Sequence, residues 1–403
     1  PQPATPDPLW SRGRGDVYKR QHLRDGPLSV ETRKEWIDRC IALLIKYQNE
    51  IAEAISEDFG HRSTESSLLA DVAGSIGSLK SAKENIKKWV KPEKRKVTPS
   101  ILGLLGAKLR LEYQPLGTVG VISPWNFPVT LTFGPLGSIF AAGNRAMIKP
   151  SEFTPKTSEL MKKMFEEVFS EEEVAVFTGG PDLGEAFSSL PFDHLLFTGA
   201  TSIAKHVMRA ASENLVPVTL ELGGKSPVII SKKSNFDVSV NRVMAGKTMN
   251  AGQICLAPDY VFIPKDKKED FISQSKKVVT EMYPSLKDNP DYTSVINQRH
   301  YDRLQGYVNE AKEKGFEVIE INPSNEEIYG VLECTSVEDL EKAIHAAFIA
   351  QSVCINLSIT ERKNILSQIL AGVIKRREEI AEIITLETVS YTHLRAHETR
   401  EDL

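Results

Sequence analysis

The sequence has few cysteines and no motif that pairs them. Its 403 residues include four cysteines, Cys40, Cys255, Cys334 and Cys354, and no two of them stand in a CxxC spacing. A secreted scaffold held by disulfides would need more cysteines at regular spacing. Apolar runs long enough to span a membrane are also missing, and the first residues carry no apolar core of the signal-peptide type. We therefore expect a reduced, cytoplasmic protein without a membrane segment.

An excess of basic charge is also lacking. The chain has 50 Lys and Arg against 54 Asp and Glu, so its formal net charge is -4. This balance argues against a nucleic-acid partner, since such proteins carry a basic face. Hydrophobic residues make up 41% and charged residues 26% of the chain, which is typical of globular proteins. The length is sufficient for two domains.

Several catalytic motifs do not occur. GxSxG, HExxH and GxGxxG are all missing, which argues against a serine hydrolase, a zinc peptidase and the common dinucleotide fingerprint. We expect no metal site. Four other segments carry reactive or ligand-type residues: ISPWNFP with Asn126, IKPSEFTP with Lys149 and Glu152, ELGGKSP with Glu221, and NAGQICLAPDY with Cys255.

Hydrophobic periodicity predicts two long N-terminal helices and then alternating strands and helices. From Lys108 onward, LRLEYQPLGTVGVISP predicts paired strand segments, and RAMIKP, VAVFTGG and HLLFTG predict short buried strands, each followed by a helix. Such alternation is typical of a parallel, doubly wound α/β sheet. VPVTLELGG and SPVIIS are expected to begin a second, incomplete α/β unit that continues with strands DYVFIP and FEVIEI. The expected helices are 32–58, 64–90, 154–169, 182–188, 201–212, 236–250, 266–282 and 300–314.

The four reactive segments contain the parts for acyl chemistry on a cysteine. A thiolate attacks carbonyl carbon, an asparagine amide with a backbone N–H can hold the resulting oxyanion, and a carboxylate can activate water. Each residue also has a purely structural interpretation. Cys255 could be a small buried residue, Asn126 a turn former, Glu221 an exposed strand-end carboxylate, and Lys149 with Glu152 a surface ion pair. Cys40 is expected in the core.

The order and spacing of PWNFP, KPSE, FTGAT, ELGGKSP and GQIC resemble the aldehyde dehydrogenase superfamily, in particular its class 3 branch, over residues 28–322. The resemblance implies that Cys255 attacks the aldehyde to give a thiohemiacetal, that Asn126 and the Cys255 backbone N–H hold its oxyanion, and that Glu221 activates water to hydrolyse the later thioester.

The resemblance also implies a Rossmann-like cofactor domain. Lys149 and Glu152 would face the adenosine ribose, and a carboxylate there favours NAD, with NADP possible, because it repels a 2′-phosphate. Further cofactor contacts are implied for Trp125, Thr198, Gly199 and Thr201. Where the family often has glycine, this chain has Ala204, whose methyl group could crowd the pyrophosphate.

The C-terminal part departs from the family pattern. Residues 357–386 align without a gap with Leu28–Glu57, with 12 identities in 30 positions. We therefore expect a chimeric chain in which 324–389 resembles the N-terminus of a second aldehyde dehydrogenase. The expected organisation is 1–21 disordered and spurious, 22–220 N-terminal helices and NAD(P)-binding domain, 221–323 incomplete catalytic domain, and 390–403 disordered and spurious.

Two functions follow from these expectations. The first is NAD(P)-dependent oxidation of an aromatic or medium-chain aldehyde to its carboxylic acid. The alternative is an inactive truncated or chimeric fragment that retains at most nucleotide binding. Cofactor-free esterase activity is a minor third possibility. The resemblance implies a homodimer, although the strand that bridges family dimers is missing from the sequence.

Overall fold

The computed structural model describes residues 26–286 and 289–316, together with the isolated positions 368, 371, 375 and 376. The chain divides into two compact units, Pro1–Glu333 and Cys334–Leu403. The predicted strand FEVIEI and the repeated segment 357–386 lie almost wholly outside the described residues. Helices α2 to α13 (within residues 30–313) and strands β1 to β9 (within residues 93–262) all lie in the first unit.

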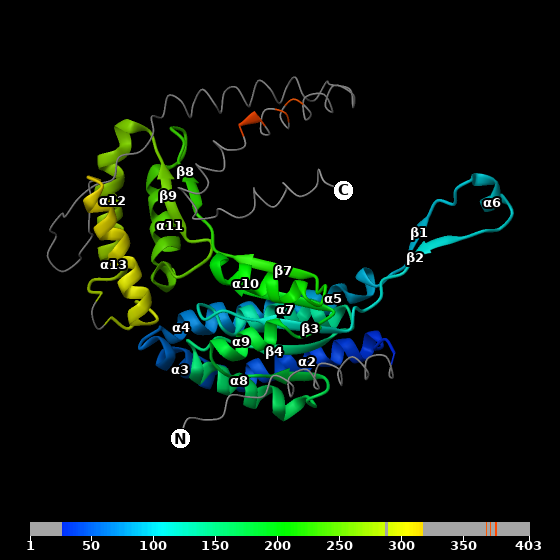
Figure 1. The fold of residues 1–403 in the computed structure, drawn as a ribbon. Helices are drawn as coiled ribbons and strands as arrows, with labels where there is room; N and C mark the ends of the chain where they lie inside the picture. The colour runs from blue at the N-terminus through cyan, green and yellow to red at the C-terminus, as the bar shows by residue number, and fades with distance from the viewer. Residues whose placement is uncertain (1–25, 287–288, 317–367, 369–370, 372–374, 377–403) are drawn as a thin grey trace. The chain divides into compact units, whose positions relative to one another are not determined.

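A five-stranded parallel sheet forms the centre of this unit (Figure 1). Its strand order is β5-β4-β3-β6-β7, so the chain winds from β3 to one edge and then returns to build the other side. This order confirms the doubly wound α/β fold expected from the sequence. The strands are β3 (Thr118–Ile122), β4 (Arg145–Lys149), β5 (Val174–Val176), β6 (His194–Gly199) and β7 (Val218–Leu222).

Alternate strand residues enter different cores on the two faces of the sheet. In β4, Ala146 and Ile148 belong to one buried cluster while Met147 between them belongs to another. Successive side chains of a strand point to opposite faces, so helices cover both. Gly120 in β3 is required on the second face, since an added Cβ would lie 2.7 Å from the Phe192 ring.

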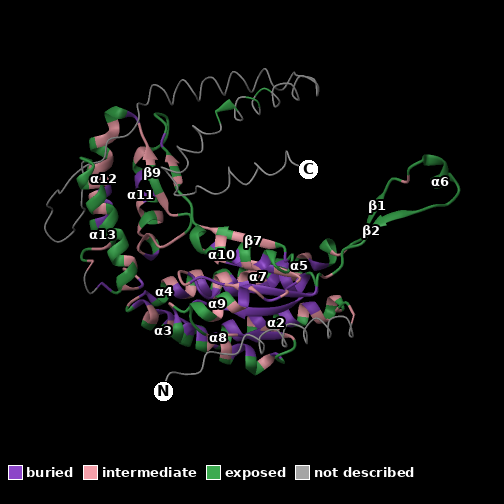
Figure 2. Cartoon of the chain, viewed as in Figure 1, coloured by how far each residue is buried: buried purple, intermediate pink, exposed green. Residues whose placement is uncertain are grey.

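Crossover helices follow the strands as the sequence predicts. They are α7 (Thr130–Ala141), α8 (Pro155–Val168), α9 (Pro181–Ser188) and α10 (Thr201–Ser212). Helices α7 and α8 contribute to the first cluster, and α9 and α10 to the second. Figure 2 shows the buried residues concentrated in these layers.

The first expected helix is divided in two, and the prediction of one continuous helix over 32–58 is wrong. Helix α2 (Val30–Lys46) and helix α3 (Gln48–Phe59) meet at Tyr47, which caps both. The first helix packs mainly on α5 (Gly74–Trp89) and α7 and also touches α8, whereas the second packs mainly on α8. The break accompanies this change of main packing partner, and no proline or glycine marks it.

The second expected helix is interrupted by a π-helical segment. Thr64–Ser67 forms α4, Leu68–Ala73 is π-helical (η1), and Gly74–Trp89 forms α5. The π segment holds Asp71, which is fully buried and accepts hydrogen bonds from the backbone of Val129 and Thr130. Single π turns often accompany functional positions.

An exposed hairpin follows α5. Strand β1 (Glu93–Arg95) pairs antiparallel with β2 (Leu109–Leu111), and the short helix α6 (Ser100–Leu104) lies between them. Figure 2 shows this excursion as exposed along almost its whole length. The expectation that 109–111 would pair with the following strand is wrong, because β3 instead pairs with β4 and β6.

A second parallel pair follows the main sheet. Strand β8 (Ser226–Ile229) is joined to β9 (Pro258–Phe262) through helix α11 (Phe236–Thr248). The segment VPVTLELGG does not begin this unit as expected, since β7 pairs with β6 in the main sheet. The expected domain boundary at 220/221 therefore falls inside β7. Helices α12 (Lys268–Met282) and α13 (Gln298–Glu313) follow, the first after a 3-10 turn, η3 (Lys265–Lys267).

Among the described residues, no helix has the length and apolar character needed to cross a membrane.

Candidate active site

The strand order reverses between β3 and β6, where ligands of open α/β sheets usually bind at the carboxyl ends of the strands. Trp125 and Asn126 follow the end of β3, and Thr198 and Gly199 end β6. Thr201 is the first residue of α10. The topology therefore gathers the expected cofactor residues at one edge of the sheet. Ala204, within α10, is buried in the second core cluster, so its methyl group packs within the protein.

Lys149 and Glu152 lie at the end of the neighbouring strand, β4. Lys149 is 3% exposed, and its ammonium donates to Glu152 at 2.8 Å. Partial burial opposes ionisation of Glu152, but the hydrogen bond and charge of Lys149, with a contribution from Arg299, lower the pKa of this carboxyl overall. The pair is thus a partly buried carboxylate held by a buried cation rather than a loose surface pair.

Glu221 lies in β7 of the main sheet, whereas Cys255 lies in the loop that precedes β9 of the second strand pair. Glu221 is exposed in β7 and lies opposite Thr198 in the register. Because β8 and β9 are parallel, the segments that enter them lie side by side, and a Cβ added to Gly224 would lie 3.7 Å from the Cys255 carbonyl oxygen. The structure brings the ELGG turn to the cysteine loop, while the hydrogen bonds of the described residues include none between the Glu221 and Cys255 side chains.

The loop before Cys255 has an unusual backbone. Asn250, Ala251 and Gly252 have φ values of 52°, 51° and 73°. Left-handed conformations cost about 1 kcal/mol for a residue with a side chain, so surrounding contacts must maintain this turn, which forms the 3-10 segment η2 (Met249–Gly252). Cys255 itself is exposed and available to a reactant, in contrast to Cys40. Cys40 is fully buried, as expected, and burial raises the pKa of its thiol.

Hydrogen bonds join Asn126 to the cysteine loop. The Asn126 Nδ2 atom donates to the Gln253 carbonyl oxygen at 2.9 Å. In return, the buried Asn250 side chain donates to the Asn126 carbonyl oxygen at 3.1 Å and to the Gln253 carbonyl oxygen at 3.3 Å. These bonds hold the Asn126 amide against Gln253, which lies two residues before Cys255 in the sequence. The second N–H of that amide can then serve a reactant.

Gln253 ties the same loop to a third segment. Its side-chain amide donates to the carbonyl oxygens of Asn250 and Ser294, and its side-chain oxygen accepts from the Ile296 backbone N–H. Ile296 is itself buried in the first core cluster. The glutamine of GQIC therefore anchors the cysteine loop.

A buried ion pair contacts the backbone of Asn126. Arg62 donates to the Asn126 carbonyl oxygen at 2.9 Å and to Asp71 at 2.8 Å. Burial lowers the pKa of Arg62 and raises that of Asp71, while their mutual attraction acts in the opposite direction. Neither residue was expected to take part in the site, because nothing local in the sequence connects positions 62, 71 and 126.

Trp125 is held between aromatic rings. Its indole lies 4.8 Å from the His300 ring and 6.1 Å from the Phe59 ring, centroid to centroid. Burial, followed by the charges of Arg303 and Arg299, lowers the pKa of His300. His300 therefore favours its neutral form against the indole face.

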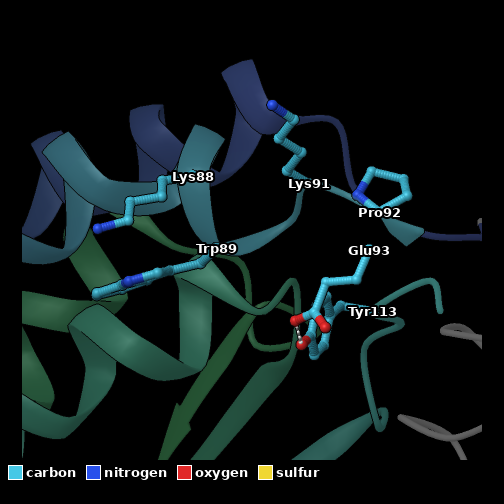
Figure 3. A pocket seen from close by; sticks show the side chains of 6 residues that line it. All are labelled: Lys88, Trp89, Lys91, Pro92, Glu93 and Tyr113. Atoms are coloured by element: carbon cyan, nitrogen blue, oxygen red, sulfur yellow. Dashed lines mark hydrogen bonds between the residues drawn. The ribbon is translucent and has the colours of Figure 1, made fainter. Parts of the chain in front are cut away.

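One surface depression lies apart from the candidate site residues, at the foot of the β1–β2 hairpin (Figure 3). It is lined by Lys88, Trp89, Lys91, Pro92, Glu93 and Tyr113. Within the described part of the chain, no group of three or more His, Cys, Asp and Glu side chains could hold a metal ion.

Comparison with known families gives a match over most of the chain. The model described as "Aldehyde dehydrogenase family" matches residues 26–321, and it matches again at 317–401. The first match alone covers well over half of the sequence.

Among curated proteins, "Probable coniferyl aldehyde dehydrogenase" of Caulobacter vibrioides is 64% identical over 316 residues, which are 78% of this chain and 65% of the relative. "Coniferyl aldehyde dehydrogenase" of a Pseudomonas species is 54% identical over 313 residues, which are 78% of this chain and 64% of the relative. This chain therefore spans slightly less than two thirds of the length of either relative.

Among solved structures, the substrate-bound state of Staphylococcus aureus AldH has a TM-score of 0.72 and 32% identity, and the alignment covers 84% of this chain and 77% of that one. The similarity in structure agrees with the similarity in sequence.

Proposed function

Because this chain belongs to the aldehyde dehydrogenase family, we propose that its described site oxidises an aldehyde to a carboxylic acid with NAD, and that NADP can replace NAD less effectively. The observation that carries the proposal is the hydrogen bond between Asn126 and Gln253. It joins two motifs from distant parts of the chain and brings an amide donor to the loop of an exposed cysteine.

Cys255 is the proposed nucleophile. Its exposed thiol gives its proton to solvent, and the sulfur forms a bond to the aldehyde carbon as the carbon–oxygen π bond opens, which gives a thiohemiacetal oxyanion. The carbonyl oxygen gains negative charge in this step. The Asn126 amide and the Cys255 backbone N–H would stabilise that charge, and one such donor is worth about 3 kcal/mol in comparable sites.

The cofactor is proposed to bind at the carboxyl edge of the main sheet. Trp125, Thr198, Gly199 and Thr201 would line its site, and Lys149 with Glu152 would hold the adenosine ribose. The ionised Glu152 fits hydroxyl groups better than a 2′-phosphate. When bound, the nicotinamide supplies a hydride acceptor, which allows the carbon attached to Cys255 to be oxidised to a thioester.

Glu221 completes the proposed cycle. Its carboxylate takes a proton from water, and the water oxygen attacks the thioester carbon. The carbon–sulfur bond then breaks to release the acid, and Glu221 returns its proton to the departing sulfur, which restores the Cys255 thiol. The approach of Gly224 to Cys255 supports this role, since it places the turn after Glu221 beside the cysteine.

The substrate is proposed to be an aromatic or medium-chain aldehyde. Two relatives named for coniferyl aldehyde, at 64% and 54% identity, support the aromatic class. The test is to mix the purified chain with NAD and an aromatic aldehyde and follow NADH absorbance. Formation of NADH with release of the acid is expected, and its absence with every aldehyde tested would refute the proposal.

A nucleotide-binding fragment without catalysis is the second candidate. Exposed apolar side chains around the cysteine loop and the β8–β9 pair favour it, with Leu256, Ile229 and Tyr260 exposed by 73%, 58% and 41%. Calorimetry would distinguish the two functions: NAD binding without NADH formation supports the fragment.

The segment after residue 323 is proposed to derive from the N-terminal region of a second family sequence. The repeat of Leu28–Glu57 at 357–386 and the second family match at 317–401 support this origin. Sequencing an intact genomic clone tests it, and a continuous frame across residue 323 would contradict it.

A further inference from the structure

Arg62 contacts the backbone of Asn126, whereas the Asn126 side chain contacts the cysteine loop. On the basis of the proposed function, we infer that Arg62, with Asp71, is a positioning residue that sets where the Asn126 amide lies relative to Cys255. Neither side chain has a contact with Cys255 or Glu221 among the described interactions. They act through the backbone of the segment that carries Asn126.

The geometry of the guanidinium links two acceptors. Arg62 is 1% exposed, and Nη1 donates to the Asn126 carbonyl oxygen at 2.9 Å while Nη2 donates to Asp71 Oδ2 at 2.8 Å. A planar guanidinium presents its donors in a fixed arrangement. The position of Asp71 therefore determines where the Asn126 carbonyl oxygen can lie.

Asp71 fixes the same segment at a second point. Its other oxygen, Oδ1, accepts from the backbone N–H groups of Val129 and Thr130, each at 3.1 Å. The ion pair thus holds the chain at residue 126 and again at 129–130. These contacts restrain the backbone from which the Asn126 side chain extends.

Aromatic rings fix the guanidinium itself. The Arg62 Cζ atom lies 4.7 Å from the centre of the Phe127 ring and 5.4 Å from that of Phe59. The ring faces attract the positive charge of the guanidinium, and the contacts restrict the orientation of the guanidinium plane. Phe127 belongs to the segment being positioned, so the contact adds a third point of attachment.

The Asn126 carbonyl oxygen is shared between this ion pair and the cysteine loop. It accepts from Arg62 and from Asn250, whose side chain also reaches the Gln253 carbonyl oxygen. A buried ion pair costs desolvation energy and is not needed for stability alone, since apolar residues often serve as well. Positioning of the Asn126 segment through these hydrogen bonds is the role that we assign to the Arg62–Asp71 pair.

A double-mutant cycle on the full chain tests the inference. Arg62→Met should slow the first turnover of NADH formation about tenfold or more, with little change in KM, and Asn126→Ala should slow it about a hundredfold. If Arg62 acts through Asn126, its substitution should have almost no further effect in the Asn126→Ala background. Independent, multiplying effects of the two substitutions would overturn the inference.

Arg33→Met is the matched control. Arg33 is 7% exposed and donates to the carbonyl oxygens of Leu28 and Ala141, with no contact to Asn126. Its loss should lower the unfolding temperature, yet the first-turnover rate of the folded protein should remain near that of the parent. A loss of rate equal to that of Arg62→Met would show a merely structural effect and contradict the inference.

Hydrogen exchange gives a readout that does not depend on catalysis. Peptides covering 249–256 should exchange faster in Arg62→Met and not in Arg33→Met, and Arg62→Lys should restore protection in part. If Arg62→Met does not fold, Arg62→Lys takes its place, with a smaller change expected in the same direction. Unchanged exchange in the substituted protein would refute the inference. Absence of NADH formation in the unsubstituted chain would instead refute the proposed function.

Discussion

The side-chain amide of Asn126 donates to the backbone carbonyl oxygen of Gln253 at 2.9 Å, two residues before Cys255. One residue follows a strand of the main sheet, and the other precedes a strand of the second pair. The bond connects the edge expected to hold a nucleotide with the loop that presents the thiol. The proposed chemistry depends on this connection, and most of the following predictions test a part of it.

Cys255→Ala should abolish NADH formation from an aromatic aldehyde, because the thiohemiacetal cannot form without the thiol. Cys40→Ala is the matched control: this thiol is fully buried, so its loss should cost about 1 kcal/mol of stability and leave turnover of the folded protein intact. Absorbance of NADH and thermal unfolding measure the two effects. Turnover by Cys255→Ala would refute the assigned nucleophile.

Glu152→Gln should reduce the preference for NAD over NADP. The carboxylate is kept ionised beside Lys149, which lowers its pKa, and its negative charge repels a 2′-phosphate. Removing the charge should change the ratio of kcat/KM values for the two cofactors by about tenfold, or roughly 1.4 kcal/mol. Glu159→Gln, on the following helix α8, is the control. An unchanged ratio would remove Glu152 from the cofactor site.

Asp71→Ala should destabilise the fold by about 3–5 kcal/mol, because it leaves the buried Arg62 cation without its partner. Asp38→Ala removes one member of an exposed pair with Lys83 and should cost less than about 1 kcal/mol. Denaturant unfolding measures both. The combined Arg62→Met and Asp71→Leu substitution should cost less than Asp71→Ala. If Asp71→Ala lowers the free energy of unfolding no more than Asp38→Ala does, the buried ion pair stabilises the fold no more than an exposed pair.

Stability should fall as the pH is lowered through the range in which His300 titrates. Burial and nearby arginines lower the pKa of this histidine in the folded protein, so the unfolded chain binds the proton more readily below about pH 6.5. The contribution is present above that pH and is lost as the pH falls through the folded-state pKa. Unfolding temperatures at about pH 7.5 and 5.5 measure the effect.

His300→Gln should reduce this pH dependence, whereas His206→Gln, on the exposed face of α10, should not. Equal slopes in the unsubstituted protein and His300→Gln would contradict the assignment.

Much of the main sheet could be predicted from the sequence. Strands β4 and β6 are short apolar runs followed by helices with a clear period, and local pattern determines such units. The end of α2 was not predictable in this way, since Tyr47 is neither proline nor glycine. The two helices differ in their main packing partners, and that information is not local. Strand β7 was placed in the wrong sheet for the same reason, because pairing depends on β6.

In the site, too, some residues could be predicted from local sequence and others could not. Asn126, Lys149, Glu152, Glu221 and Cys255 could be proposed from motifs, because reactive and charged residues stand out within short segments. Arg62 and Asn250 could not, since their roles come from contacts with the Asn126 backbone across the fold. Nor could Asp71, which contacts Arg62 and the backbone of Val129 and Thr130. A π-helical turn around Asp71 has no simple sequence pattern. The sequence therefore predicted candidate reactive groups but not what holds them in place.

Glu221→Gln allows the most direct test of the central claim, that Cys255 carries the acyl group and Glu221 releases it. The substituted chain is mixed with NAD and an aromatic aldehyde, quenched in acid and analysed by peptide mass spectrometry, with Glu213→Gln as an exposed control. The account predicts an acyl group trapped on the peptide that contains Cys255, formed together with NADH, and little of it in the control. An acyl group on another residue, or rapid NADH formation with no covalent intermediate in Glu221→Gln, would contradict the account.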